Sequence, residues 1–104
     1  MLVLFDQGTP APLRHHLPGH EIQTAHELGW SELLNGDLIA AAEGRFDVLI
    51  TTDRQMKHRL SLAGRTLAVL VLPTTSWPRL QPSASEIAAA IAHVRPGEFT
   101  ELDR

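Results

Sequence analysis

Two apolar runs in this chain each end on an aspartate. The first, LVLFD, ends at Asp6, and the second, DVLITTD, ends at Asp53. Their apolar residues follow one another without alternation, which is typical of strands buried on both faces of a parallel sheet. Ligands of open parallel sheets gather at the carboxyl ends of the strands, where the strand order reverses. Two carboxylates delivered there repel each other unless a cation or a proton lies between them.

Length and composition predict one globular domain over residues 1–104. The hydrophobic content of 43% is ordinary for a folded protein, and the absence of cysteine excludes disulfides, thiol catalysis and cysteine-ligated zinc. The first predicted strand starts directly after Met1, which leaves no room for a signal peptide, and no apolar run approaches membrane-spanning length. We therefore expect a soluble cytoplasmic protein with no membrane partner.

Strand-like and helix-like segments alternate along the whole chain. This alternation predicts an α/β fold, with a mostly parallel sheet of four to five strands flanked by helices. The least readable stretch, rich in turn signals, is 25–36, which predicts at most one helical turn. The predicted strands cover residues 2–5, 20–24, 47–52 and 67–72, with an edge strand at 98–102.

Four residues or pairs mark the expected helix starts. Thr9 precedes two prolines suited to a first helical turn. Asp37 and Asp53 each stand where a helix is expected to open. Ser83 and Glu86 have the spacing of a capping box for the last helix.

The expected extents of these segments also follow from the sequence. The helix after Asp53 is expected to end near Gly64, and the proline-rich stretch 74–82 is expected to be a loop. The last helix is expected to bury Ile87, Ile91 and Val94.

The aspartates are the strongest candidates for chemistry. Asp6 follows a strand, and Thr9 already marks the next helix start, which disfavours a capping role for Asp6. Asp53 and Asp37 are each also explained by helix capping alone. If all three converge, they make a hard oxygen site suited to Mg²⁺ or Mn²⁺, which activates water and stabilises displacement at a phosphodiester. Thr52 is a candidate to orient a water or a ligand.

The remaining polar residues give weaker signals. The net charge of −3 does not suggest a broad basic face for duplex DNA, but Arg54 and Lys57 follow the second acidic strand end closely. They are candidates for binding an RNA backbone, although a solvated helix face would look the same. Trp30 and Trp77 either cover edges of the core or stack on a base or a partner. Alternative supporting acids are Glu21, Glu27, Glu32 and Glu43.

Several other chemistries lack their motifs. The six histidines are scattered or adjacent and form no metal motif. The segment that follows the first strand lacks the glycine spacing of a phosphate loop. No nucleophile elbow is present for a serine triad.

Three segments together resemble a small PIN-like domain of the compact VapC-like toxin group. They are FDQGTP, NGDLIAAAEGRFDVLITTD and LAVLVLP, and the resemblance covers nearly the whole chain. It implies an endoribonuclease that uses Mg²⁺ or Mn²⁺, with Asp6, Asp37 and Asp53 as ligands and Thr52 as a polar neighbour. It also implies a cognate antitoxin protein and a homodimer. The chain departs from the family at Gln7, where relatives often carry an acid, and in lacking a placeable fourth acid.

Two other readings remain open. A catalytically inactive binding module would retain every one of these sequence features. A receiver domain of two-component signalling would use Asp6, Asp53 and Thr74. Against the receiver, the first strand supplies one acid rather than a pair, and Lys57 is the only lysine, so none follows the last strand.

Overall fold

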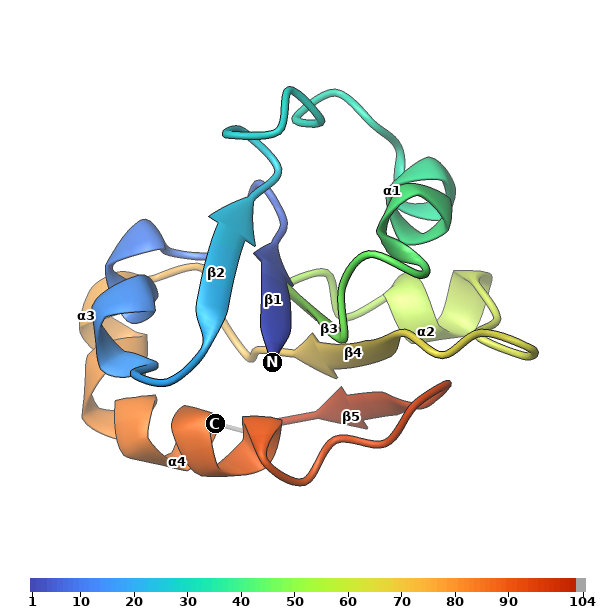
Figure 1. The fold of residues 1–104 in the computed structure, drawn as a ribbon. Helices are drawn as coiled ribbons and strands as arrows, with labels where there is room; N and C mark the ends of the chain where they lie inside the picture. Colours follow the sequence, from blue (N-terminus) through green and yellow to red (C-terminus); the bar gives the residue numbers. More distant parts are fainter. Residues whose placement is uncertain (103–104) are drawn as a thin grey trace.

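The computed structural model describes residues 1–102 and confirms the α/β prediction. Five strands form one sheet in the order β2-β1-β3-β4-β5, and every neighbouring pair is parallel. Figure 1 shows β1 beside β2 and β3, with β5 at the far edge. The strands are β1 (Leu2–Phe5), β2 (Glu21–Thr24), β3 (Val48–Thr51), β4 (Ala68–Val71) and β5 (Phe99–Glu101). All five predicted strands are present, each within one residue of its predicted ends.

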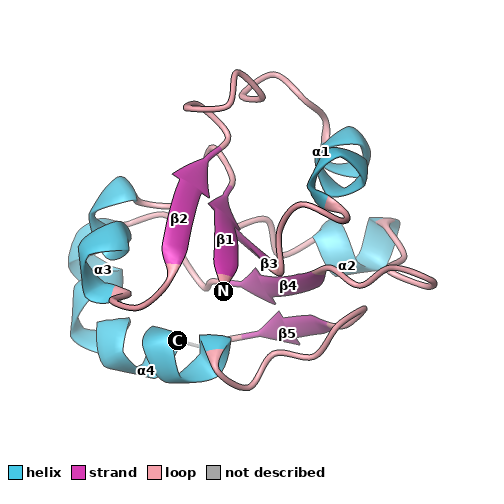
Figure 2. Cartoon of the chain, in the orientation of Figure 1, coloured by secondary structure: helices cyan, strands magenta, loops and turns pink. Residues whose placement is uncertain are grey.

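Helical segments cover both faces of the sheet (Figure 2). Side chains of η1, α3 and α4 join one buried cluster, whereas those of α1 and α2 join the other. This arrangement is the doubly wound order in which the chain reverses direction between β1 and β3. The helical elements are η1 (Ala11–His16), α1 (Asn35–Ala42), α2 (Met56–Arg59), α3 (Trp77–Leu80), η2 (Gln81–Ser83) and α4 (Ala84–Ile91).

The inner strands β1, β3 and β4 are buried on both faces, as the unbroken apolar runs predict. Successive residues alternate between the two clusters, so Phe5 and Ile50 face η1 and α4, while Leu4 and Leu49 face α1. All four of these side chains are fully buried. The central strands β1 and β3 are therefore fixed from both sides, which holds the residues at their carboxyl ends in place.

Trp30 and Trp77 pack at opposite edges of the core, which supports the structural reading of both. Trp30 makes an edge-to-face contact with Phe46, and the guanidinium of Arg45 lies over its ring. Trp77 packs against the other cluster and contacts the ring of His16. In residues 1–102, no helix has the length and apolar character needed to cross a lipid bilayer.

Several predicted helix starts are wrong. Thr9 does not cap η1, because its hydroxyl lies against Asp6 and the Ile50 carbonyl instead. Asp37 does not open α1, which begins two residues earlier at Asn35. The side chain of Ser83 makes no cap, because α4 continues from η2 and the Ala84 amide donates to the carbonyl of Gln81.

Helix lengths also differ from the prediction. The segment after Asp53 forms only the short helix α2, which ends at Arg59 rather than near Gly64. The last helix, α4, ends at Ile91, before Val94. The proline-rich stretch expected to be a loop contains α3 and η2, because Pro78 and Pro82 lie in first turns, where no amide donor is needed.

The connection into β5 depends on Gly97, whose backbone has φ +75°. A Cβ there would lie 2.9 Å from the carbonyl oxygen of Arg65, a backbone atom that cannot rotate away. We expect Gly97→Ala to destabilise the fold by at least about 2 kcal/mol, since left-handed strain alone costs about 1 kcal/mol. The matched control is Gly19→Ala, because Gly19 has φ +85° and no atom near its Cβ position. Urea unfolding should give the larger loss for Gly97→Ala, and equal losses would contradict this account.

Candidate functional site

Asp6 lies at the carboxyl end of β1 and is 8% exposed. Its Oδ1 accepts hydrogen bonds from the amides of Gly8 (3.1 Å) and Thr9 (3.0 Å). The Thr9 hydroxyl lies 2.7 Å from the same oxygen and 2.8 Å from the carbonyl oxygen of Ile50. Asp6 therefore shapes the turn after β1, a capping-type role that the sequence had disfavoured.

Thr51 links Asp6 to the end of β3. This fully buried threonine donates its hydroxyl to Asp6 Oδ2, and its Oγ1 accepts from the backbone amide of Asp53 at 3.1 Å. One hydroxyl thus bridges the two strand ends that flank the reversal in strand order. Through this hydroxyl the Asp6 carboxylate is linked to the backbone of Asp53, the residue that follows the neighbouring strand.

Asp53 is partly exposed and is held by two donors. Its Oδ2 accepts from the Asn35 side-chain nitrogen at 2.6 Å, and its Oδ1 accepts from the amide of Gln55 at 2.9 Å. The second bond is a turn-type contact just before α2. Because α2 begins at Met56 with Gln55 as its N-cap, the prediction that Asp53 opens this helix is wrong. Asn35 was missed as a site residue because the Asn-Gly pair was interpreted only as a turn signal.

Thr52 is a further polar residue between the ends of the strands. A Cβ added at Gly8 would lie 2.6 Å from Thr52 Oγ1, so only glycine allows the turn after β1 to approach this hydroxyl so closely. Thr75, from the segment after β4, borders the same point. Residues that follow three strands therefore converge here, and Thr52 lies among them as predicted.

Asp37 is the third of the predicted carboxylate ligands. It is exposed in the first turn of α1. Across residues 1–102, no three His, Asp or Glu side chains lie close enough to hold one metal ion. The described residues therefore do not fit a cage of three carboxylates. Two of the alternative acids have structural partners, because Glu43 binds Thr66 and Glu27 binds Arg14.

Asp6 and Asp53 do fit a cation that keeps most of its water. Each carboxylate oxygen has two lone pairs, and Asp6 Oδ2 and both oxygens of Asp53 each accept one hydrogen bond in the structure. Mg²⁺ is usually bound through one or two carboxylates, with waters and substrate phosphates completing its octahedron. Asp6 and Asp53 are therefore the residues that could hold Mg²⁺ or Mn²⁺.

The two predicted RNA-binding cations share one acidic partner. Glu101 on the edge strand β5 lies 3.1 Å from Lys57 Nζ and 3.6 Å from Arg54 Nη2. The hydrogen bond from Lys57 lowers the pKa of Glu101. Both predicted RNA-binding cations therefore lie against the edge strand β5.

A cavity of about 310 Å³ opens on the other side of Asp6, toward β2. Thr24 and Glu27 form its wall as a reciprocal pair: the Glu27 amide donates to the Thr24 hydroxyl, and the Thr24 amide donates to Glu27 Oε1, both at 3.0 Å. The two terminal guanidinium nitrogens of Arg14 donate to the Glu27 carboxylate oxygens at 2.6 and 3.0 Å. Thr24 and Glu27 have the spacing of a capping box, so this reciprocal pair could have been predicted from the sequence.

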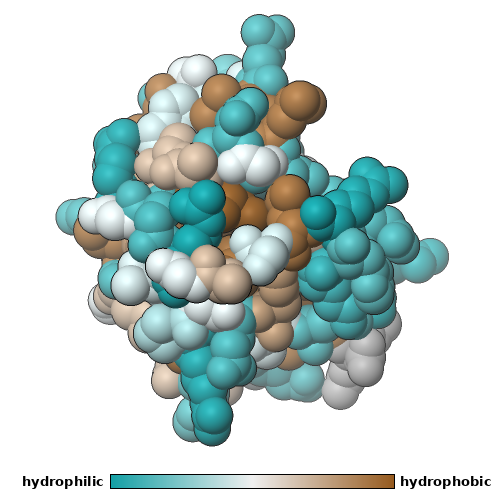
Figure 3. Space-filling model, turned by 90° about the vertical axis from the view of Figure 1, so that its right-hand side faces the viewer, coloured by the Kyte–Doolittle hydropathy of each residue, from teal (hydrophilic) through white to brown (hydrophobic). Residues whose placement is uncertain are grey.

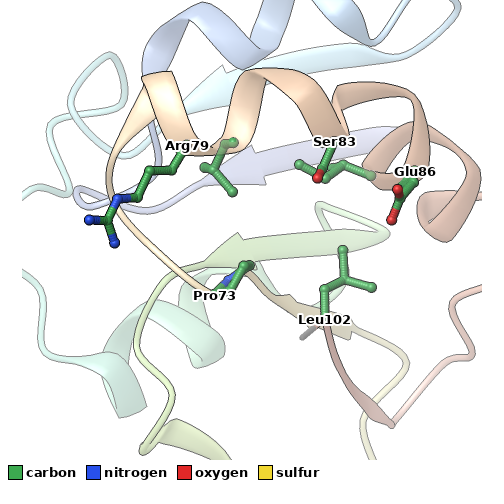
Figure 4. A pocket seen from close by; sticks show the side chains of 7 residues that line it. Pro73, Arg79, Ser83, Glu86 and Leu102 are labelled. Carbon is green, nitrogen blue, oxygen red and sulfur yellow. The ribbon is translucent and has the colours of Figure 1, made fainter. Parts of the chain in front are cut away.

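Other surface features lie elsewhere. Figure 4 shows a hollow of about 40 Å³ between Pro73, Ser83 and Leu102, which is lined by neither aspartate of the strand-end site. Figure 3 shows the side of α1 and α2, where hydrophobic surface gathers at the centre between hydrophilic side chains. Leu34, the residue before α1, is 77% exposed.

Removing the bridging hydroxyl should destabilise the site. In Thr51→Val, Asp6 Oδ2 and the Asp53 amide lose their buried partner, so we expect a loss of about 1–3 kcal/mol. Thr51→Ser keeps the hydroxyl and should lose less, about the 0.8 kcal/mol of one buried methyl group. Urea unfolding of both variants measures the difference. A valine variant as stable as the serine variant would show that the bridge contributes nothing.

The Glu27 contacts predict a pH-dependent contribution to stability. The Arg14 hydrogen bond, helped by the Thr24 amide, lowers the pKa of Glu27 from 4.5 to about 2. A group with a lowered folded pKa stabilises the fold above its unfolded pKa, and this contribution is lost as pH falls through its folded pKa. The gap in Tm between wild type and Glu27→Gln should therefore shrink from pH 5 to pH 2. A gap that widens over this range would contradict the assignment.

Comparison of the chain with models of known protein families, with curated proteins and with solved structures found no match. The PIN-like family therefore stays an expectation from the sequence.

Proposed function

We propose that this chain is a metal-dependent endoribonuclease of PIN-like type, the toxin of a bacterial toxin–antitoxin pair. The observation that carries the proposal is the Thr51 bridge between Asp6 and Asp53 at the reversal in strand order. Parallel sheets of this topology bind their ligands there. When bound by these carboxylates, Mg²⁺ or Mn²⁺ would activate water and stabilise the charge that develops at the RNA phosphodiester.

The chain's own residues have separate tasks in this proposal. Thr51 orients the Asp6 carboxylate, and Asn35 orients that of Asp53. The hydroxyl of Thr52 lies close enough to the turn at Gly8 to hold a water beside Asp6. Arg54 and Lys57 attract the phosphate backbone from the corner they share with Glu101, an electrostatic role that salt would weaken.

The proposed protein partner is the cognate antitoxin. Leu34 supports this, because it is strongly exposed and directly precedes Asn35, the residue that holds Asp53. An antitoxin that covers Leu34 would lie beside the proposed cation-binding pair. A homodimer remains part of the proposal on the family resemblance alone.

A second candidate is an inactive binding module of the same fold. Two observations favour it. Asp6 Oδ1 already accepts hydrogen bonds from two amides and a hydroxyl, and no third acid joins Asp6 and Asp53 in a metal-binding group within residues 1–102. A receiver domain shares the sheet order, but the Thr74 side chain accepts from the Ser76 amide, and no lysine follows β5. Labelling of Asp53 by acetyl phosphate would favour the receiver.

Cleavage of single-stranded RNA in Mn²⁺ by antitoxin-free protein tests the proposal. Replacing a residue that merely orients a metal ligand costs about 10- to 100-fold in affinity or activity. We therefore expect Asn35→Ala to lose about 10-fold, and Asp6→Asn and Asp53→Asn to lose at least about 100-fold. The matched control is Asp47→Asn, because Asp47 binds the Leu2 amide at the opposite strand ends.

The outcomes separate the candidates. Cleavage that a chelator and both aspartate variants abolish, with Asp47→Asn active, supports the nuclease. A folded wild type that cleaves nothing favours the binding module, and cleavage unchanged in Asp6→Asn would overturn the proposed site. Circular dichroism of each variant checks that the fold is intact.

A further inference from the structure

The cavity beside Asp6 shares a wall with the proposed cleavage site. It is lined by Asp6 and Gln7 from the turn after β1, by Arg14 of η1, and by the segment Thr24–Glu27 after β2. At about 310 Å³ it lies at the lower end of the size range of small-molecule sites. Asp6 thus belongs both to the proposed cation-binding pair and to the wall of an open cavity of the size of one small ligand unit.

The charges of the lining argue against a phosphate in the cavity. It carries two carboxylates, Asp6 and Glu27, against one guanidinium, and both terminal nitrogens of Arg14 are already bound to Glu27. One of these nitrogens also donates to the carbonyl oxygen of Ile22. Fixed carboxylates repel a phosphate but accept from the amino and imino groups of a neutral ligand.

His26 supplies a flat ring to the lining and is exposed. Its backbone lies inside the reciprocal Thr24–Glu27 pair and is therefore fixed before any ligand arrives. Imidazole rings stack on nucleobases in RNA complexes, and stacking tolerates every base because each has a π face. Gln7, whose amide nitrogen donates to the Ser31 carbonyl, adds a polar side chain of fixed orientation.

We propose that this cavity binds the neutral base of one nucleotide of the substrate, next to the phosphate acted on at Asp6 and Asp53. The inference rests on the proposed nuclease function for its setting, but base binding itself requires no cation. His26 would be the stacking residue. Gln7 would donate to or accept from the base edge, Glu27 would accept from it, and together they would set the preference of the enzyme among the four bases.

NMR titration with the four uncharged ribonucleosides, in metal-free buffer, tests the proposal. We expect the amide signals of Gln7, Thr24 and His26 to shift with at least one nucleoside, whereas inorganic phosphate should leave them unmoved. Because stacking on one side chain is worth roughly tenfold or more in affinity, His26→Ala should weaken that binding about tenfold. The matched control is His93→Ala, an exposed histidine outside this cavity, which should bind as the wild type does.

The experiments distinguish failure of the base-site proposal from failure of the nuclease proposal. Binding that depends on His26, without any RNA cleavage, keeps the base site and removes the nuclease. Cleavage without nucleoside shifts at these three amides, and with the same base preference in wild type and His26→Ala, overturns the base site alone. Equal binding by the two histidine variants also overturns it.

Discussion

The geometry of the strand ends depends on how one buried carboxylate is satisfied. Asp6 follows the central strand β1, and its low exposure makes an unpartnered charge there costly. The two amides that follow it and the hydroxyls of Thr9 and Thr51 supply its donors. Because Thr51 belongs to β3, this carboxylate ties together the two strands between which the chain reverses direction. Within residues 1–102, no buried side-chain nitrogen or oxygen lacks a partner, so the polar end of the sheet is fully ordered by its own contacts.

This order has consequences on both sides of Asp6. On one side, the Thr51 hydroxyl accepts from the backbone amide of Asp53, and Asn35 at the start of α1 donates to the Asp53 carboxylate. Protein donors therefore hold both carboxylates before any cation arrives. On the other side, the turn formed by Gln7 and Gly8 becomes part of the cavity wall that the Thr24–Glu27 pair completes. Arg54 and Lys57 lie against Glu101 of the edge strand β5. In the proposed function, the strand-end aspartates bind the cation, the cavity takes a neutral group and these two side chains attract the phosphate backbone.

Much of this fold could be predicted from the sequence. Unbroken apolar runs identify the buried strands β1, β3 and β4, because burial on both faces leaves little choice of residues. The less buried strands β2 and β5 also lie within one residue of their predicted positions. Helix starts were harder, since Thr9, Asp37 and Ser83 are typical capping residues whose side chains found other partners or solvent. Local capping signals do not reveal that a buried acid several residues away competes for the same hydroxyl. The strand-end rule pointed to the ends of β1 and β3, where Thr51 links Asp6 to the backbone of Asp53. The start of α1 at Asn35 and the contact of Asn35 with Asp53 depend on how α1 approaches the sheet, which no local pattern encodes.

The most direct test of the central claim is to map where Mn²⁺ binds. Paramagnetic Mn²⁺ broadens the amide signals nearest to it in a two-dimensional ¹H–¹⁵N NMR spectrum, without any need for activity or substrate. The account predicts that substoichiometric Mn²⁺ selectively broadens the signals of Gly8, Thr52 and Asp53, and that Asp6→Asn abolishes this effect while Asp47→Asn leaves it intact. Broadening centred instead on the exposed turn at Asp37, or no selective broadening at all, would contradict a cation site between the ends of β1 and β3.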